Sequence, residues 1–174
     1  INIGKLNTHE YAYGPTNEHS LFGSCLNPWD TRYFSGGSSG GSGSAVAASL
    51  CLGATGSDTG GSIRIPSACC GITGLKPTYG RVSRAGIFPL CWTMDHSGPM
   101  TRSAEDAAYL LQAMAGPDIR DSASSQQPVP NYLSALSGNI EGIKIGLPSR
   151  YFFDQADEHI ELSVMNFLIS STNE

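Results

Sequence analysis

The chain has 174 residues, of which 40% are hydrophobic and only 14% are charged, with 21 glycines and a formal net charge of −5. This length fits one domain or part of one, and the apolar content is sufficient for a core, which excludes global disorder. The ten Lys and Arg residues are scattered along the chain, so no direct contact with nucleic acid is expected. No run approaches the roughly 18 apolar residues of a membrane span, and no membrane partner is expected.

Neither the cysteines nor the histidines follow a metal-binding pattern. The cysteines are odd in number and contain no CxxC pair, and the histidines show no HExxH spacing. We therefore expect buried free thiols in a cytoplasmic protein, with no metal and no cofactor.

A ten-residue run of only glycine and serine, residues 35–44, follows a turn-rich and aromatic segment. The Ala-rich stretch 45–52 predicts a buried helix whose first turn is this run. The preceding 34 residues are too few for a self-sufficient domain, so the run is interpreted as a helix start and not as a flexible linker. A second glycine loop, 56–62, lies just downstream.

Helices and strands are predicted to alternate in the rest of the chain. Residues 86–90 predict a short strand between turn signals. Ser103 predicts the N-cap of a helix that ends at Gly116-Pro117. Further on, residues 143–147 predict a strand, and residues 157–169 an amphipathic helix. Its inward side chains are expected to be Ile160, Val164, Phe167 and Leu168. This alternation predicts an α/β fold.

The two glycine loops do not match the P-loop or Rossmann phosphate-binding motifs, but one of them matches a hydrolase motif. Neither glycine loop continues into Lys-Ser or Lys-Thr, and neither forms a GxGxxG between strand and helix. Residues 36–40 match the G-x-S-x-G elbow, which would make Ser38 a nucleophile with His96 and either Asp58 or Asp95. This match is nearly unavoidable in a Gly/Ser tract, and the segment before it is a poor strand. A Ser-His-Asp hydrolase is therefore not favoured.

The combination of the two loops is far more specific than either alone. Residues 35–44, followed by Gly-Ser-Asp-Thr-Gly-Gly-Ser-Ile-Arg-Ile-Pro at 56–66, resemble the amidase signature family. The flanking segments 4–14, 71–83 and 90–102 resemble it as well, and the similarity is dense from about residue 3 to 118.

This resemblance implies a mixed β-sheet covered by helices and a Ser–Ser–Lys triad. It implies that Ser62 is the nucleophile and Ser38 the bridging serine, held by a cis peptide bond after Gly37. The backbone N–H groups of Thr59, Gly60, Gly61 and Ser62 correspond to the oxyanion hole. These roles fit the chemistry, because a serine hydroxyl needs a base and a tetrahedral oxygen needs nearby donors. Water is the second substrate, so no cofactor is implied.

One feature of the family has no counterpart in this chain. The family's catalytic lysine lies upstream of the first glycine loop, whereas Lys5 belongs to a different motif and Lys76 and Lys144 lie downstream. We therefore expect residues 1–174 to be the central fragment of a single amidase signature domain. The N-terminal part with the catalytic lysine and the C-terminal part would be missing, and the fragment alone would be inactive.

Three functions are compatible with these residues. The first is an amidohydrolase that cleaves linear amides through an acyl-enzyme on Ser62, with a small-molecule amide and water as partners and a homodimer left open. The second is the glutamine amidase subunit of a tRNA-dependent amidotransferase, with the other subunits as partners. There Gln commonly follows Ser-Ile-Arg, and Ile65 in this place favours the first function. The third is a catalytically silent binding or scaffold protein, against which the presence of both Ser38 and Ser62 argues.

Overall fold

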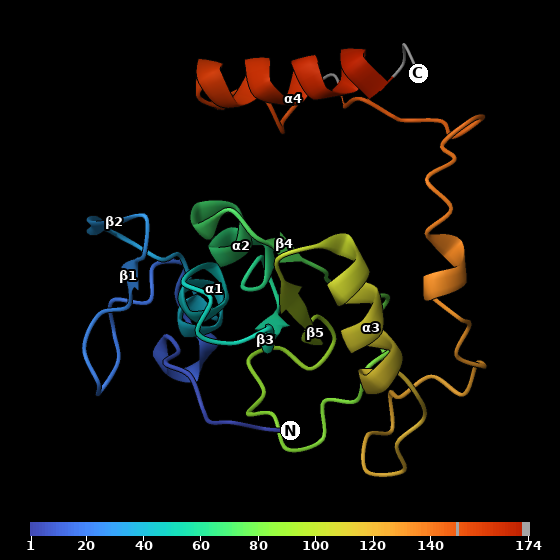
Figure 1. Cartoon of the computed structure of the whole chain (residues 1–174). Coiled ribbons are helices and arrows are strands. Elements are labelled where there is room, and N and C mark those ends of the chain that lie inside the picture. Colours follow the sequence, from blue (N-terminus) through green and yellow to red (C-terminus); the bar gives the residue numbers. More distant parts are fainter. Residues whose placement is uncertain (149, 172–174) are drawn as a thin grey trace. The chain divides into compact units, whose positions relative to one another are not determined.

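The computed structural model describes residues 1–148 and 150–171, which fall into two compact units, Ile1–Ser137 and Gly138–Glu174 (Figure 1). The second unit holds α4, Glu158–Ser171. The first unit holds both glycine loops. Its elements are η1 Glu10–Ala12, β1 Leu26–Asn27, β2 Asp30–Phe34, α1 Gly40–Ala47, β3 Gly53–Asp58, α2 Arg64–Cys70, β4 Thr73–Gly74, β5 His96–Thr101, α3 Ala104–Met114 and η2 Leu133–Ala135.

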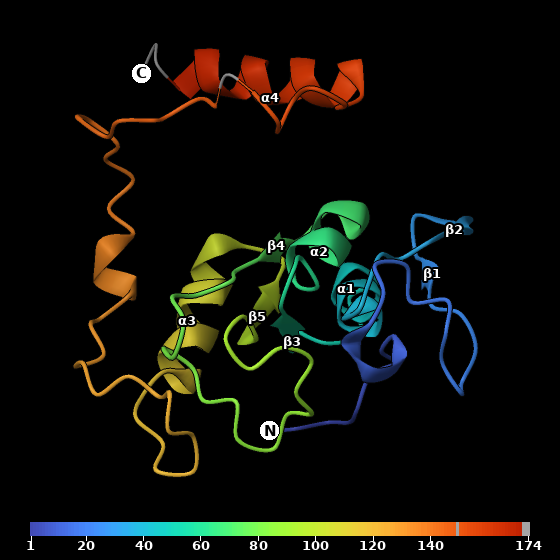
Figure 2. The same ribbon diagram turned by 180° about the vertical axis from the view of Figure 1, so that it is seen from behind.

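The core of the first unit is a three-stranded sheet in the order β3–β5–β4. β3 pairs with β5 from Gly53 opposite Thr101 to Asp58 opposite His96. In both views the sheet lies between α1 and α3 (Figure 1, Figure 2). The predicted α/β class is confirmed. Every strand pair of the described residues is antiparallel, so the parallel pairs of a mixed sheet are not among them.

The glycine–serine run is buried and ordered, and it forms the start of α1 as predicted. The Gly41 N–H donates to the Asn7 carbonyl at 2.9 Å. A Cβ on Gly41 would lie 2.4 Å from that oxygen, so only glycine lets the two backbones approach this closely. The run is therefore a packing surface and not a linker.

The predicted extent of this helix, 45–52, is wrong: α1 covers Gly40–Ala47. The helix stops because Ser49 adopts a left-handed φ of +60°. Its N–H donates to Val46 O and the Leu50 N–H donates to Ala45 O, the bond pair of a Schellman end. Leu50 and Leu52 consequently lie beyond the helix and are exposed.

The hairpin β1–β2 closes the C-terminal end of α2. The Asn27 side-chain amide donates to Cys69 O at 2.8 Å, and the Trp29 indole N–H donates to Cys70 O at 2.7 Å. Because the last carbonyls of a helix have no partner within it, these two side chains satisfy groups that would otherwise be unpaired.

The helix predicted after Ser103 is confirmed as α3. Ser103 is its N-cap, with its hydroxyl oxygen accepting from the Asp106 N–H at 3.0 Å. Ala107, Ala108 and Leu111 are buried on the face that meets the sheet. Fully or nearly fully buried apolar side chains complete this core: Val46, Ile63, Cys70 and Met100.

The strand predicted at 86–90 is not formed. The segment turns at Ile87, whose N–H donates to Arg84 O. The Leu90 N–H donates to the Asp95 carboxylate at 2.9 Å, not to a neighbouring strand. Side-chain acceptors therefore replace a strand partner here.

The second unit contains the predicted C-terminal helix, α4, but not the predicted strand at 143–147. Ile143, Ile145 and Leu147 alternate apolar side chains with small or charged ones, yet no described residue of this unit pairs with them as a strand. The expected inward face of α4 is not buried either. Ile160, Val164 and Phe167 are exposed and Leu168 is half-buried, because the described part of this unit has no second layer to cover them.

The described residues include no helix with the length and apolar character that crossing a bilayer requires. The five cysteines carry no disulfide, but the expected burial holds only for Cys70: Cys69 is exposed, and Cys25, Cys51 and Cys91 are half-buried. Burial raises the pKa of the Cys70 thiol to about 11, so this thiol stays protonated and packs as an apolar group.

The N-cap of α3 yields a stability prediction. In the complete protein, Ser103→Ala should lower the free energy of unfolding by about 1 kcal/mol, because the Asp106 N–H loses its partner. Ser122→Ala is the matched control, since Ser122 is exposed and its hydroxyl makes no hydrogen bond in the described residues. Denaturant midpoints measure both variants, and equal midpoints would show that the cap contributes nothing.

Candidate active site

The two glycine loops meet in the first unit, although they are far apart in the sequence. The Ser39 N–H donates to Ser62 O at 3.2 Å, and the His9 N–H donates to Ser38 O at 2.9 Å. Ser38 is buried, and the Gly37–Ser38 peptide is cis, as the resemblance implied. The fold therefore brings the two predicted catalytic serines to adjoining backbone segments.

The other hydroxyls of the glycine–serine run are committed to structural hydrogen bonds. Ser39 donates to Ser57 O and also accepts from the Ser57 N–H, and Ser42 donates to Thr55 O. These bonds attach α1 to β3. Ser35 and Ser44 donate to Gly36 O and Leu26 O. This leaves Ser38 as the serine of the run whose hydroxyl makes no hydrogen bond within the described chain.

The hydroxyl of Ser62 is likewise uncommitted among the described residues. No hydrogen bond joins it to the Ser38 hydroxyl there, so the proton relay between the two serines stays a prediction. The adjoining backbones are compatible with such a relay, because a small rotation of either side chain changes where its hydroxyl points.

A pocket of about 470 Å³ lies beside Ser62. It is lined by the turn Thr59–Ser62, by residues 12–15, and by Ile65 and Leu90. Within the described residues, the backbone N–H groups of Thr59, Gly60, Gly61 and Ser62 donate to no protein acceptor. Four free donors on one pocket wall are an arrangement that can stabilise a developing negative charge.

The Asp58 carboxylate binds the residues that directly follow the C-terminal end of this turn. Its fully buried carboxylate accepts from the Ile63 and Arg64 N–H groups at 3.1 and 3.3 Å. It also pairs with the Arg64 guanidinium and with the Lys76 ammonium, each at 3.0 Å. Burial opposes the charge, but hydrogen bonds from Arg64 and Lys76 outweigh it and lower the pKa of Asp58 to about 2. The group is therefore ionised and locks the turn onto the start of α2.

The Asp95 carboxylate binds Thr59, the first residue of the turn. Its nearly buried carboxylate accepts from the Thr59 hydroxyl and from the Leu90 and Cys91 N–H groups. It thus ties the glycine turn to the Leu90 wall of the pocket.

The Ser-His-Asp arrangement considered from the sequence is not assembled. The His96 ring Nδ1 lies 2.6 Å from Met94 O and donates to it. In the described residues, the carboxylates of Asp58 and Asp95 make no hydrogen bond to the His96 ring, and neither does the Ser38 hydroxyl.

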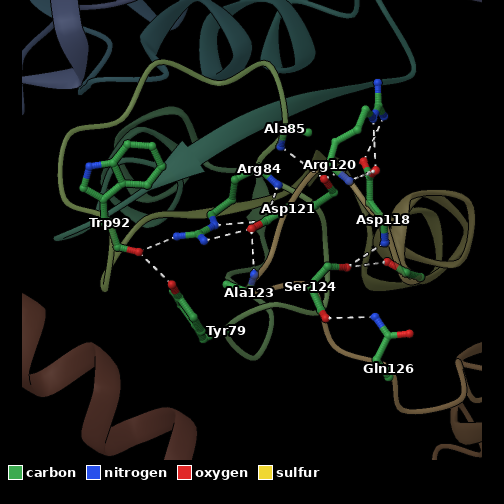
Figure 3. Close-up of polar contacts among 12 residues, drawn as sticks. Tyr79, Arg84, Ala85, Trp92, Asp118, Arg120, Asp121, Ala123, Ser124 and Gln126 are labelled. Atoms are coloured by element: carbon green, nitrogen blue, oxygen red, sulfur yellow. Dashed lines mark hydrogen bonds and ion pairs between the residues drawn. The ribbon is translucent and has the colours of Figure 1, made fainter.

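A polar cluster holds the carbonyl of Trp92, which lies two residues after Leu90 (Figure 3). Arg84 lies between the Asp121 carboxylate, at 3.1 Å, and the Trp92 carbonyl, to which Tyr79 also donates. Both partners of the ion pair are nearly buried, and the Arg84 hydrogen bond lowers the pKa of Asp121 to about 2. The loop after α3 therefore supports one wall of the pocket.

No lysine of the first unit hydrogen-bonds to either serine hydroxyl in the described residues. Lys76 is bound to Asp58 and to Thr59 O, Lys5 is exposed, and Lys144 lies in the second unit. No three His, Cys, Asp or Glu side chains of the described chain form a group that could hold a metal ion.

Sequence reasoning assigned no role to several residues that shape this site. Asp58 and Asp95 were considered only as members of a hydrolase triad, and Lys76 only as a misplaced base. One signal in the sequence could have indicated the role of Asp58. It directly precedes the glycine turn, and Arg64, a possible ion-pair partner, follows that turn. Nothing in the sequence pairs Asp95 with Thr59.

A family model described as Amidase matches residues 1–172. A glutamyl-tRNA(Gln) amidotransferase subunit of Coxiella burnetii is 55% identical over 164 residues, which are 94% of this chain and 34% of that protein. A solved chain from a vestigial protein complex, connected with the evolutionary origins of an s-triazine catabolic enzyme, superimposes with a TM-score of 0.89. It shares 43% identity over 92% of this chain and 35% of its own. Peptide amidase from Stenotrophomonas maltophilia gives 0.66 and 40%, over 75% of this chain and 28% of its own. The chain thus spans about a third of the curated relatives it matches.

The buried Asp58 carboxylate predicts a specific acid dependence of stability. Its pKa is about 2 in the folded protein against 3.8 ordinarily, so its contribution is complete above about pH 4 and is lost as the pH falls towards 2. The contribution is about 2 kcal/mol. In Asp58→Asn this loss is absent, so the difference in unfolding free energy between wild type and variant should shrink as the pH falls from 5 to 2.

Denaturant unfolding of the complete protein at several pH values measures this difference. Asp154→Asn, at an exposed carboxylate in the second unit, is the control and should keep the acid-dependent loss of the wild type. A constant difference between wild type and Asp58→Asn would contradict the assignment.

Proposed function

This chain belongs to the amidase family, and we propose that the complete protein cleaves the C–N bond of an amide through an acyl-enzyme on Ser62. The observation that supports this most directly is the pocket of about 470 Å³ whose wall presents Ser62 and four free backbone N–H donors. Nucleophile and oxyanion donors on one short turn are the arrangement that acyl transfer requires.

In the proposed mechanism the Ser62 oxygen attacks the carbonyl carbon. The hydroxyl proton passes to Ser38 while Ser38 gives its own proton to a base. The tetrahedral oxygen is held by the Thr59–Ser62 backbone. Collapse breaks the C–N bond, the nitrogen leaves with a proton, and the acyl group stays on Ser62 as an ester. Water then adds to the ester, releasing a carboxylic acid and restoring the serine hydroxyl.

We propose that the base is a lysine other than Lys5, Lys76 and Lys144. Lys76 is committed to Asp58 and Thr59 O, and neither serine hydroxyl accepts or donates a hydrogen bond with any lysine of the described residues. The family resemblance assigns the base to a segment upstream of the first glycine loop.

The substrate that we favour is the side-chain amide of glutamine, with ammonia passed to partner amidotransferase subunits. The support is the 55% identity with the Coxiella burnetii amidotransferase protein over 94% of this chain. This reverses the preference drawn from Ile65 alone, since one residue weighs less than similarity along nearly the whole chain.

The five free thiols support a reducing, cytoplasmic setting.

A stand-alone amidase for an apolar amide is the second candidate. Ile65 and Leu90 both line the pocket, and the side chain of Ile65 lies against Gly61, where a Cβ would meet its Cδ1 at 2.7 Å. An apolar wall at this position suits an aliphatic or aromatic acyl group better than the charged backbone of an amino acid.

The roles of the two serines are tested by substitution in the complete protein. Ser62→Ala should abolish labelling by a fluorophosphonate and lower turnover by about 10⁴-fold or more, because the nucleophile is gone. Ser38→Ala should keep Ser62 as the only candidate nucleophile but slow labelling by about 10²-fold or more, because the proton has no bridge. Mass spectrometry locates the label.

Ser44→Ala is the control from the same run, since its hydroxyl only donates to Leu26 O; it should keep turnover within about twofold. Label found on Ser38 or Ser39 in place of Ser62 would refute the assignment. A folded complete protein that takes no label would support the catalytically silent alternative.

The two substrate classes are separated by comparing L-glutamine with hexanamide. For the complete protein with its partner subunits, kcat/KM for ammonia release should be about 100-fold higher with glutamine, because an apolar amide leaves polar groups of a glutamine site unpaired. The reverse order of kcat/KM would favour the stand-alone amidase.

A further inference from the structure

Three carbonyl groups of the turn beside the pocket accept hydrogen bonds from the protein. Thr59 O accepts from the Lys76 ammonium at 3.0 Å. Gly61 O accepts from the Ile65 N–H at 2.6 Å, and Ser62 O accepts from the Ser39 N–H at 3.2 Å. Two of these donors are backbone groups, and only Thr59 O is held by a side chain.

The direction of a carbonyl determines the direction of the next N–H. In a planar trans peptide the C=O of one residue and the N–H of the following residue point in opposite directions. The Thr59–Gly60 peptide is trans, since Gly37–Ser38 is the cis bond of the described chain. Lys76 does not line the pocket, so a bond from it to Thr59 O favours the orientation in which the Gly60 N–H faces the pocket.

The peptide between Thr59 and Gly60 has little else to hold its orientation. A Cβ on Gly60 would meet nothing within 4 Å, so this residue faces open space, and it lines the pocket. Glycine also lets a peptide plane rotate through conformations closed to other residues. Asp95 accepts from the Thr59 hydroxyl and makes no hydrogen bond to this peptide group in the described residues.

Lys76 is well placed to hold the peptide. Its side chain is 21% exposed, and its ammonium is fixed by the buried Asp58 carboxylate at 3.0 Å. Its neighbour Leu75 is fixed to β5, with the Leu75 N–H donating to Pro99 O at 3.0 Å. The ammonium is thus held by the Asp58 carboxylate, and its chain segment is held by β5, in addition to the bond with Thr59 O.

We propose that Lys76 is a positioning residue of the oxyanion hole, which directs the Gly60 N–H into the pocket by holding the Thr59 carbonyl. Lys76 is then not the general base but acts through the peptide group of the turn. This inference rests on the proposed acyl transfer at Ser62 and specifies how one of its donors is oriented.

Arg64 provides a matched comparison. Both cations pair with the same Asp58 carboxylate at the same distance, 3.0 Å, but only Lys76 also contacts Thr59 O. If Lys76 served only to balance the Asp58 charge, removing either cation would affect turnover alike. If it acts through Thr59 O, Lys76→Met alone should impair the chemical step.

The experiment compares Lys76→Met and Arg64→Met in the complete protein. Lys76→Met should lower kcat about 30-fold, less than the roughly 10²–10³-fold cost of removing one oxyanion donor outright, with KM changed less than about threefold. The rate of fluorophosphonate labelling at Ser62 should fall in parallel, because the phosphoryl oxygen uses the same donors. Arg64→Met leaves the bond to Thr59 O in place, so it should lower kcat clearly less than Lys76→Met does.

The pH profile separates positioning from general-base catalysis. Lys76→Met should lower kcat/KM by the same factor at every pH and leave its midpoint on the acid side unchanged. Loss of that acid-side dependence would make Lys76 the base and overturn the proposal. Equal losses of kcat in Lys76→Met and Arg64→Met would also overturn it. Failure of the wild type to label at Ser62 would instead refute the proposed function.

A second comparison covers the case in which Lys76→Met does not fold because Asp58 loses a buried partner. Asp58→Asn removes that charge, so Lys76→Met is then introduced into the Asp58→Asn protein. The amide oxygen that replaces the carboxylate can still accept from the Lys76 ammonium, so the double variant should again show a lower kcat than Asp58→Asn alone, by about 10-fold or more. Equal kcat values for these two proteins would contradict a role through Thr59 O.

Discussion

The buried carboxylate of Asp58 is the constraint on which the rest of the site depends. Asp58 is the last residue of β3, and its carboxylate receives the first N–H groups of the helical turn that leads into α2. A buried charge is stable only where donors surround it, and here the donors come from three places: the turn, Arg64 and Lys76. Strand, turn, helix and the segment after β4 are therefore joined at one point. The glycine turn beside the pocket lies between Asp58 and Asp95 and is held at both ends.

The serines of the first loop show how hydrogen bonding separates structural from reactive hydroxyls. Ser39 and Ser42 differ from Ser38 in no property that the sequence displays, but their hydroxyls are bound to carbonyls of β3. A hydroxyl that donates to a buried carbonyl is a poor proton relay, because its proton is already engaged. Ser38 is buried without such a bond, which leaves its hydroxyl available for a partner.

Much of this architecture could be predicted where local chemistry decides the structure. The Ser103 cap and Gly116 made α3 predictable, and the two glycine loops made the serine pair predictable by resemblance. Other elements depend on contacts that are distant in the sequence. β3 and β5 contain glycine and proline and have low intrinsic strand preference, and the pairing between them forms them. Pro66 lies in the first turn of α2, where a helix tolerates proline. Because proline usually indicates a break in a helix, the sequence did not predict α2. The end of α1 was missed because Ser49, and not glycine, takes the left-handed conformation.

The hairpin that closes α2 makes the N-terminal segment and the turn that carries Ser62 parts of one cooperative element. Asn27 and Trp29 supply the donors for the last carbonyls of the helix that begins two residues after Ser62. Opening the hairpin would leave those carbonyls unpaired, and fraying would then travel along two helical turns towards Asp58. Amide hydrogen exchange in α2 should consequently follow the opening of β1–β2, so that a segment without contact to the pocket sets how long the pocket wall stays intact.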